Sequence, residues 1–299
     1  MAGSPDRMKR CSDRLRRPGL WSTLVRDCSG LVGLLLFAAI VAVAVIGPWT
    51  VRSDPLRVNL ERAFAPPGTS GLFGADHLGR DLTARLIWGA RTSLLSGAGA
   101  LAIGLAAGVP IGLVAGYRRG AVDEVVMGLL EVLMAFPGIL LAILAVAVLG
   151  AGRTTVVVAV GLVSVPLVAR VVRGTTLALR EAEYVLAARA LGVGERRILW
   201  RHILPGCLSP LIVLSVLRLA TTIVTVSGLG FLGLGGDPAV PEWGAMLSEG
   251  LAYLRRAPHL ALLPGAAILL TVLSVNLFGD ALNDALNPRL RSRTGGPPW

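Results

Sequence analysis

The chain contains six long apolar segments, and these restrict the folds open to it more than any other feature of the sequence. A helix needs about 20 residues to cross the ~30 Å hydrocarbon core of a bilayer. The chain is also 54% hydrophobic and only 16% charged, with a mean hydropathy of +0.70, whereas soluble domains carry about 25% charged residues. We therefore predict an all-α polytopic membrane protein with six transmembrane helices, near residues 31–49, 92–116, 125–149, 154–172, 208–234 and 259–279.

Composition divides the chain into five consecutive parts. They are a basic N-terminal arm (1–30), a first transmembrane helix (31–49), a polar loop (50–91), a five-helix core that includes a charged segment at 174–207 (92–280), and a short tail (281–299). The first span follows basic residues, as the apolar part of a secretory signal does. Because it is longer than such a signal and five more spans follow, we interpret it as an uncleaved anchor.

The distribution of basic residues predicts which loops face the cytoplasm. Seven of the 29 Lys and Arg residues precede the first span, and seven more lie between Arg170 and Arg201. Cytoplasmic loops of membrane proteins are enriched in Lys and Arg. We therefore expect both termini and the 174–207 segment in the cytoplasm and the 50–91 loop outside it. The same rule explains the net charge of +11 better than nucleic-acid binding does.

Several catalytic classes are disfavoured by the residues that the chain lacks. Lys9 is the only lysine and no G-x-x-x-x-G-K-[ST] pattern occurs, so the chain has no P-loop with which to hydrolyse ATP. The three Cys and three His residues show neither C-x-x-C nor H-E-x-x-H spacing, and no metal site or disulfide framework is predicted. We expect no catalytic residue and no cofactor in this chain.

The second span carries a regular pattern of glycines. Gly104, Gly108, Gly112 and Gly116 recur every four residues, which places them on one face of a helix. Without side chains on that face, a second helix can approach closely. The pattern predicts helix packing and indicates nothing about a substrate.

The charged segment EYVLAARALGVGERRILWRHILPG (Glu183–Gly206) lies between two spans and predicts two short helices. The first runs from Glu183 to Leu191, with Tyr184, Ala187, Ala188 and Leu191 sharing one face. Gly192 is suited to ending it, because glycine adopts the left-handed conformation of a helix C-terminus. The second begins at Glu195. The small residues on the first helix would let a partner approach closely, and the alternative is an amphipathic loop on the lipid surface.

This segment resembles the EAA loop of ATP-binding-cassette (ABC) import permeases, whose pattern is Glu-Ala-Ala, three residues, Gly, nine residues and Ile-x-Leu-Pro. The matching positions are Ala187, Ala188, Gly192, Leu204 and Pro205. Leu186 and His202 depart from the pattern in the way that is usual in the peptide and nickel branch. The resemblance identifies the ATPase-coupling residues as Glu183, Tyr184, Ala187, Ala188, Leu191, Gly192, Leu204 and Pro205.

Further segments resemble the C-type subunit of the dipeptide and oligopeptide permeases in the same order along the chain. They are FGADHLGRDLTARLIWGARTSL (Phe73–Leu94), LMAFPGILLAI (Leu133–Ile143), GFLGLGGDPAVPEWGAML (Gly230–Leu247) and NLFGDALNDALNPRLR (Asn276–Arg291). The resemblance implies a type I ABC importer permease fold and a peptide importer in the cytoplasmic (inner) membrane of a bacterium. It also implies four partners: a second homologous permease, two ATPases that bind ATP and Mg, and an extracytoplasmic substrate-binding protein.

Four charged residues are candidates for an outer mouth or a pathway. Arg80 and Asp81 precede the second span, where Asp81 is also suited to capping the helix. Glu131 and Arg218 lie within predicted spans, where ionisable residues usually face a watery cavity or the bundle interior. Glu131 has a simpler explanation, which is pairing with Arg170. Arg218 is suited to a substrate carboxylate or to an acidic residue of a partner chain.

The cargo and two other classes of protein stay open from the sequence. Related systems also carry nickel, haem and glycan-peptides, and Val226 replaces a Glu that family members often have in the fifth span. A stand-alone channel or secondary transporter would favour inverted repeats and charged pathway residues, and neither is evident. An intramembrane enzyme is the weakest alternative, because no nucleophile–base pair or metal constellation is found.

Overall fold

The computed structural model describes residues 28–51, 53–69 and 71–286. These residues form helices and no strand. In chain order the helices are α3 (Cys28–Thr50), the 3₁₀ turn η1 (Leu60–Arg62), α4 (Leu82–Arg118), α5 (Ala121–Met134), α6 (Gly138–Leu149), α7 (Arg153–Leu179), α8 (Glu183–Ala190), α9 (Glu195–Ile198), the π-helical turn η2 (Leu199–Ile203), α10 (Leu204–Phe231), α11 (Trp243–Leu251) and α12 (His259–Leu286). The predicted arm up to residue 27 and the tail from residue 287 lie outside the described residues.

The prediction of an all-α membrane protein with six spans is confirmed. Five helical stretches are long and apolar enough to cross a bilayer: α3, α4, α7, the run from α9 to α10, and α12. The bent pair α5–α6 supplies the sixth crossing when it is counted as one span.

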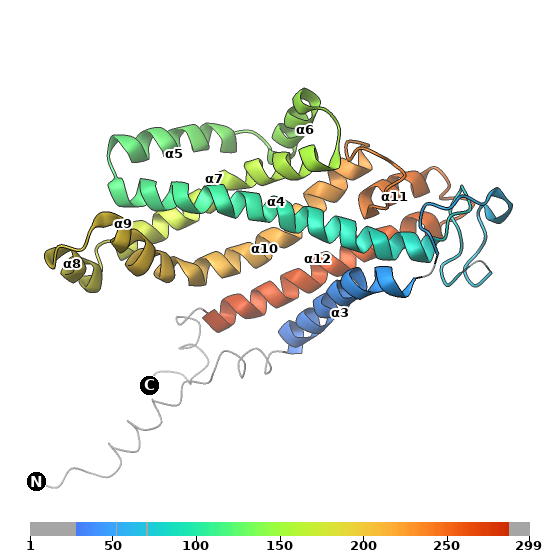
Figure 1. Cartoon of the computed structure of the whole chain (residues 1–299), viewed down its shortest axis with the longest axis horizontal. Coiled ribbons are helices and arrows are strands. Elements are labelled where there is room, and N and C mark those ends of the chain that lie inside the picture. The colour runs from blue at the N-terminus through green and yellow to red at the C-terminus, as the bar shows by residue number, and fades with distance from the viewer. Residues whose placement is uncertain (1–27, 52, 70, 287–299) are drawn as a thin grey trace, which may run out of the picture.

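The helices form an elongated bundle with two distinct ends (Figure 1). Helices α4 and α7 make the most extensive contact, α10 packs against both, and α3 and α12 pack together on the far side of α10. One end of the bundle carries α8 and α9, which we call the α8 end. The opposite end carries α11 and the segment between α3 and α4, and we call it the α11 end.

The glycine face predicted for the second span forms the contact between α4 and α7. A Cβ added at Gly104 would lie 2.8 Å from the Cβ of Ser164, and one at Gly108 would lie 2.7 Å from the Cβ of Val168. Since carbon atoms in contact are normally 3.5–4.0 Å apart, residues with a Cβ do not fit at this helix spacing. The packing role inferred from the glycine spacing is confirmed.

Several helices extend beyond the apolar segments that predicted them. Helix α4 begins at Leu82 and not at Thr92, because Asp81 caps it: the Asp81 Oδ1 accepts hydrogen bonds from the N–H groups of Thr83 (2.9 Å) and Ala84 (3.3 Å). Helices α7 and α12 likewise continue to Leu179 and Leu286. Hydropathy locates only the part of a helix that lies in hydrocarbon, whereas capping groups and polar contacts set its ends.

The prediction of one continuous third span over residues 125–149 is wrong. Helix α5 ends at Met134, α6 begins at Gly138, and the two axes differ by 91°. Pro137 explains the break, because proline disfavours helical geometry at the preceding residue, Phe136, and has no N–H to donate.

Candidate functional site

Helix α8 confirms the short helix predicted at the start of the charged segment, and its end is tightly defined. Gly192 has a φ of +77°. Its N–H donates to the Arg189 carbonyl (3.0 Å) and the Val193 N–H donates to the Ala188 carbonyl (3.1 Å), which are the two hydrogen bonds of a Schellman motif. A Cβ at Gly192 would have nothing within 4 Å. Backbone conformation, and not lack of space, therefore favours glycine at this position.

The side chains of α8 divide into a buried and an exposed side. Val185 and Ala188 are 0% and 7% exposed. Tyr184, Ala187 and Leu191 are exposed, Leu191 at 84%. The sequence-based prediction grouped Ala188 with the partner-facing residues. The structure places Ala188 against its own chain instead, because it lies one turn from the buried Val185. We call Tyr184, Ala187 and Leu191 the outer α8 surface.

Polar and aromatic contacts hold α8 and the short connection from α7 to α8 against the end of α4. The Arg180 guanidinium donates to the Tyr117 carbonyl at the end of α4 (2.5 Å). The guanidinium carbons of Arg180 and Arg189 lie 5.8 and 5.7 Å from the centre of the Tyr117 ring, within the range of cation–π attraction. Arg119 pairs with Glu181 at 3.0 Å. These contacts connect α8 and the residues before it to the end of α4.

The remaining predicted coupling residues lie at helix starts. Glu183 occupies the first turn of α8, where a negative charge is favoured by the helix dipole. Leu204 and Pro205 form the first turn of α10, where proline is favoured because the N–H it lacks would have no partner in the helix. The π-helical turn η2 immediately precedes them, and such irregular turns are frequent at functional sites.

Glu131 lies on the outer side of α5 and not in the interior of the bundle. Its side chain is 63% exposed, and a carboxylate oxygen lies 3.8 Å from Nη2 of Arg170, which is itself 47% exposed. The simpler explanation, pairing with Arg170, therefore describes the contact that Glu131 makes. A role in a pathway stays a prediction.

Arg218 is half-buried in α10 and lines an apolar cavity and a smaller polar one. Its Nη2 donates to the Ser164 Oγ (3.0 Å), while its buried Nε has no hydrogen-bond partner among the described residues. The polar cavity measures about 180 Å³ and includes Ser164, Thr221 and Thr225. Arg218, Thr221 and Thr225 lie three and four residues apart, so they share one face of α10.

Arg80 belongs to a buried charge cluster at the α11 end that the sequence did not reveal. Its Nε donates to the Asp76 Oδ2 (2.5 Å) and its Nη2 to the Glu249 Oε2 (3.0 Å). The guanidinium of Arg85 lies 3.5 Å from Asp76 and 3.4 Å from Glu249. Asp76, His77 and Glu249 have ligand atoms within 4.8 Å of one another, but the two arginines already balance both carboxylates. Arg80 is thus held by structural ion pairs, and its role in an outer mouth stays a prediction.

Glu242 is a second buried acid that the sequence did not reveal. Its carboxylate caps α11 by accepting from the N–H groups of Gly244 (2.9 Å) and Ala245 (2.8 Å), and it also accepts from the hydroxyls of Ser93 (3.1 Å) and Ser227 (3.3 Å). Burial raises the pKa of the Glu242 carboxyl above its ordinary value, although these four hydrogen bonds oppose the shift. The four donors join α4, α10 and α11 around one carboxylate.

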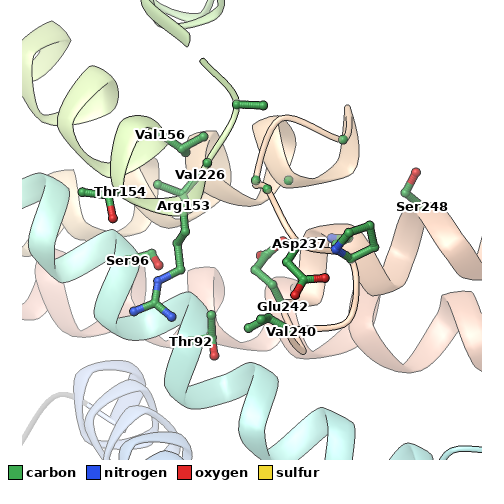
Figure 2. A pocket seen from close by; sticks show the side chains of 18 of the residues that line it. Thr92, Ser96, Arg153, Thr154, Val156, Val226, Asp237, Val240, Glu242 and Ser248 are labelled. Atoms are coloured by element: carbon green, nitrogen blue, oxygen red, sulfur yellow. Dashed lines mark hydrogen bonds between the residues drawn. The ribbon is translucent and has the colours of Figure 1, made fainter. Parts of the chain in front are cut away.

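A cavity of about 650 Å³ opens at the α11 end, between α4, the start of α7 and the connection from α10 to α11 (Figure 2). Its lining includes the hydroxyls of Thr92 and Ser96 and the charged residues Arg153, Asp237 and Glu242. Val226, which stands where family members often have a Glu, also lines it. This volume is in the range of small-molecule sites, about 300–1,000 Å³.

Comparison with known proteins decides the family. The profile of the family described as "Binding-protein-dependent transport system inner membrane component" matches residues 108–292. This chain belongs to that family. The permease therefore is a membrane component of an ABC importer, and the resemblance of its EAA segment to such importers is confirmed.

Curated relatives match the permease over nearly its whole length. The glutathione transport system permease protein GsiD of Escherichia coli O6:K15:H31 is 43% identical over 282 residues, which is 93% of this chain and 93% of the relative. The GsiD protein of Pectobacterium atrosepticum is 42% identical over 273 residues, 91% of each chain. These relatives confirm the resemblance to C-type subunits of the peptide permease group.

A solved structure supports the same fold. The MetNI methionine ABC transporter, in inward-facing conformations, contains a chain that superposes on the permease with a TM-score of 0.54 at 20% identity, covering 68% of this chain and 96% of that one. At this identity the comparison supports the type I permease fold alone. Membership in the family implies ATPase and substrate-binding partners.

Proposed function

We propose that this permease forms half of the translocation pathway of an importer for short peptides and couples it to separate ATPases through α8. A peptide cargo is supported by the 43% identity, over 93% of the chain, to a permease of a glutathione transport system, because glutathione is a tripeptide. ATP and Mg bind to the partner ATPases in this proposal, and the permease itself is not catalytic.

The geometry of α8 supports a docking role at the ATPase. The outer α8 surface presents Tyr184, Ala187 and Leu191 to the outside of the chain, and Leu191 is 84% exposed. Arg189 of α8 lies over the Tyr117 ring at the end of α4, and the residues just before α8 contact the same end through Arg180–Tyr117 and Glu181–Arg119. A helix that is exposed on one side and fixed on the other can carry ATPase closure into the spans, because the two states then differ in their contacts. In this proposal the α8 end faces the cytoplasm, which the arginines of 174–207 support.

The charged and hydroxyl-bearing face of α10 supports a second permease. Arg218, Thr221 and Thr225 lie on one face, and within the described chain only Ser164 accepts a hydrogen bond from Arg218. A charged residue in contact with lipid at the bilayer centre costs at least ~2.5–3.5 kcal/mol on insertion scales. A homologous permease that covers this face would enclose Arg218 in a polar pathway between the two subunits.

The coupling proposal is tested at Gly192. A Gly192→Val change places a β-branched residue at a φ of +77°, which costs about 1–2 kcal/mol and disrupts the end of α8. ATP-driven uptake should fall steeply or the ATPases should dissociate. Gly192→Asn is the matched control, because asparagine tolerates this conformation. Normal assembly and uptake in the valine variant would contradict the proposal.

The cargo proposal is tested by uptake into proteoliposomes that contain the complete importer, with its binding protein added. Orientation controls exclude the contribution of importers inserted inside-out. Trialanine, glutathione and nickel are offered separately, with and without ATP. Peptide uptake that requires ATP is expected. Uptake of nickel without uptake of either peptide would contradict the peptide assignment and leave the ABC permease assignment intact.

A further inference from the structure

The cavity at the α11 end carries charges that the proposed coupling role does not use (Figure 2). Arg153 begins α7, and Figure 2 shows its side chain extending into the open space on the side of α4. The side chain of Arg153 makes no hydrogen bond or ion pair within the described part of the chain. A guanidinium presents five N–H donors in a fixed fork that matches a carboxylate. Arg153 is therefore available to an anionic ligand.

The hydroxyl of Ser96 is a second, independent sign of a ligand. Ser96 lines the same cavity and is only 2% exposed, yet its buried Oγ has no hydrogen-bond partner among the described residues. Its neighbours differ in this respect, because Thr92 donates to the Trp88 carbonyl (3.1 Å) and Ser93 to Glu242 (3.1 Å). Buried polar atoms are nearly always paired, so Ser96 indicates a group that occupies the cavity.

The acidic side of the cavity contains one carboxylate with spare capacity. Four donors satisfy Glu242, and two arginines pair with Glu249. Asp237 is exposed and takes part in no described ion pair, and its carboxylate accepts one hydrogen bond, from the Ala239 N–H (2.8 Å). Figure 2 shows Arg153 on one side of the open space and Asp237 on the other.

We infer that this cavity binds the two charged ends of a short peptide. The inference rests on the proposed function and adds a site to it. The Arg153 guanidinium binds the peptide carboxylate, the Ser96 hydroxyl donates to a peptide oxygen, and the Asp237 carboxylate accepts from the peptide ammonium. A cation and an anion on opposite sides fit a zwitterion better than a metal ion or a polyanion. The volume of about 650 Å³ suits a peptide of a few residues.

The test measures direct binding to the purified complex of permeases and ATPases, with the binding protein omitted, by equilibrium dialysis. The probes are radiolabelled trialanine and glutathione, together with the C-terminal amide and the N-acetyl form of trialanine. Arg153→Gln should weaken binding of trialanine about tenfold or more, because a charge-assisted hydrogen bond is lost, and should leave the amide unaffected. Asp237→Asn should weaken trialanine similarly and leave the N-acetyl form unaffected.

Matched controls lie at the same end of the molecule, outside the cavity. Arg255→Gln changes an exposed arginine. Asp54→Asn changes an exposed aspartate that accepts from the N–H two residues later (2.9 Å), as Asp237 does. Both controls should bind trialanine as the wild type does.

Two results would overturn the site. They are no saturable peptide binding by the wild-type complex, or equal weakening of every probe by Arg153→Gln and Asp237→Asn. ATP-driven uptake by the wild type is measured in parallel. Saturable, charge-selective binding without uptake would support the site and count against the proposed function instead.

Discussion

Replacing Gly108 with alanine tests how closely α4 and α7 are packed. The added Cβ would lie 2.7 Å from both Cβ and Cγ1 of Val168 and 3.0 Å from the Val165 carbonyl oxygen. Carbon atoms in contact prefer 3.5–4.0 Å, so the helices must separate locally by roughly 0.8 Å. Val168 cannot rotate its Cβ away, and the carbonyl belongs to the α7 backbone. Overpacking of this kind costs about 1–3 kcal/mol.

A second glycine provides the control. Gly128 lies in α5, and a Cβ there would have nothing within 4 Å. Alanine is about 1 kcal/mol better than glycine in a helix, and this gain is common to both variants. The difference between Gly108→Ala and Gly128→Ala therefore isolates the packing cost of about 1–3 kcal/mol.

Thermal unfolding of the purified permease in detergent, followed by circular dichroism, measures this difference. A change of 1 kcal/mol shifts Tm by ~2–4 °C for domains of 150–250 residues, so Gly108→Ala should melt at least about 2 °C below Gly128→Ala. Equal Tm values for the two variants would refute the close α4–α7 contact.

Three further experiments probe the buried Glu242, the Asp81 cap of α4 and the orientation of the chain in the membrane. Burial raises the pKa of the Glu242 carboxyl, so the folded state binds its proton more tightly than the unfolded state does. The Tm of the wild type, measured relative to the non-titrating Glu242→Gln, should therefore fall as pH rises above about 4.3. A constant Tm difference between pH 4 and 8 would contradict the raised pKa. Asp81→Ala should lower the Tm by removing two capping hydrogen bonds, at a cost of about 0.5–2 kcal/mol of stability. Asp81→Asn should retain most of that stability, because asparagine also caps helices. In a cysteine-free background, an impermeant thiol reagent applied to whole cells should label Arg255→Cys and not Leu191→Cys; the reverse pattern would invert the assigned orientation.

The features predicted correctly from the sequence are those that one helix determines by itself. The spacing of Gly104 to Gly116 predicts a close helix contact before the partner helix is known, and Gly192 predicts a helix end because its conformation is local. The EAA-like segment and the further segments that resemble the peptide permeases then indicate the family, because several separate matches in the same order are more specific than any single motif.

The features that the sequence did not reveal join residues far apart in the chain. Arg80 and Glu249 are 169 residues apart, so nothing local to either one signals the pair. Glu242 meets Ser93 across 149 residues. The break between α5 and α6 lies at Pro137, but the apolar residues on both sides of it predict one continuous span. Helical spacing groups Ala188 with Tyr184, Ala187 and Leu191, but Ala188 lies at the edge of that face and is buried beside Val185.

Flux measured with and without the partner subunits tests whether this chain works as one permease subunit of an ATP-driven importer. Proteoliposomes are prepared with the permease alone and with the complete set of second permease, ATPases and binding protein. Radiolabelled trialanine and glutathione are the probes, each with and without ATP. We expect no flux from the permease alone under either condition, and ATP-dependent peptide uptake only by the complete set. Robust flux from the isolated chain would instead identify it as a channel or secondary transporter.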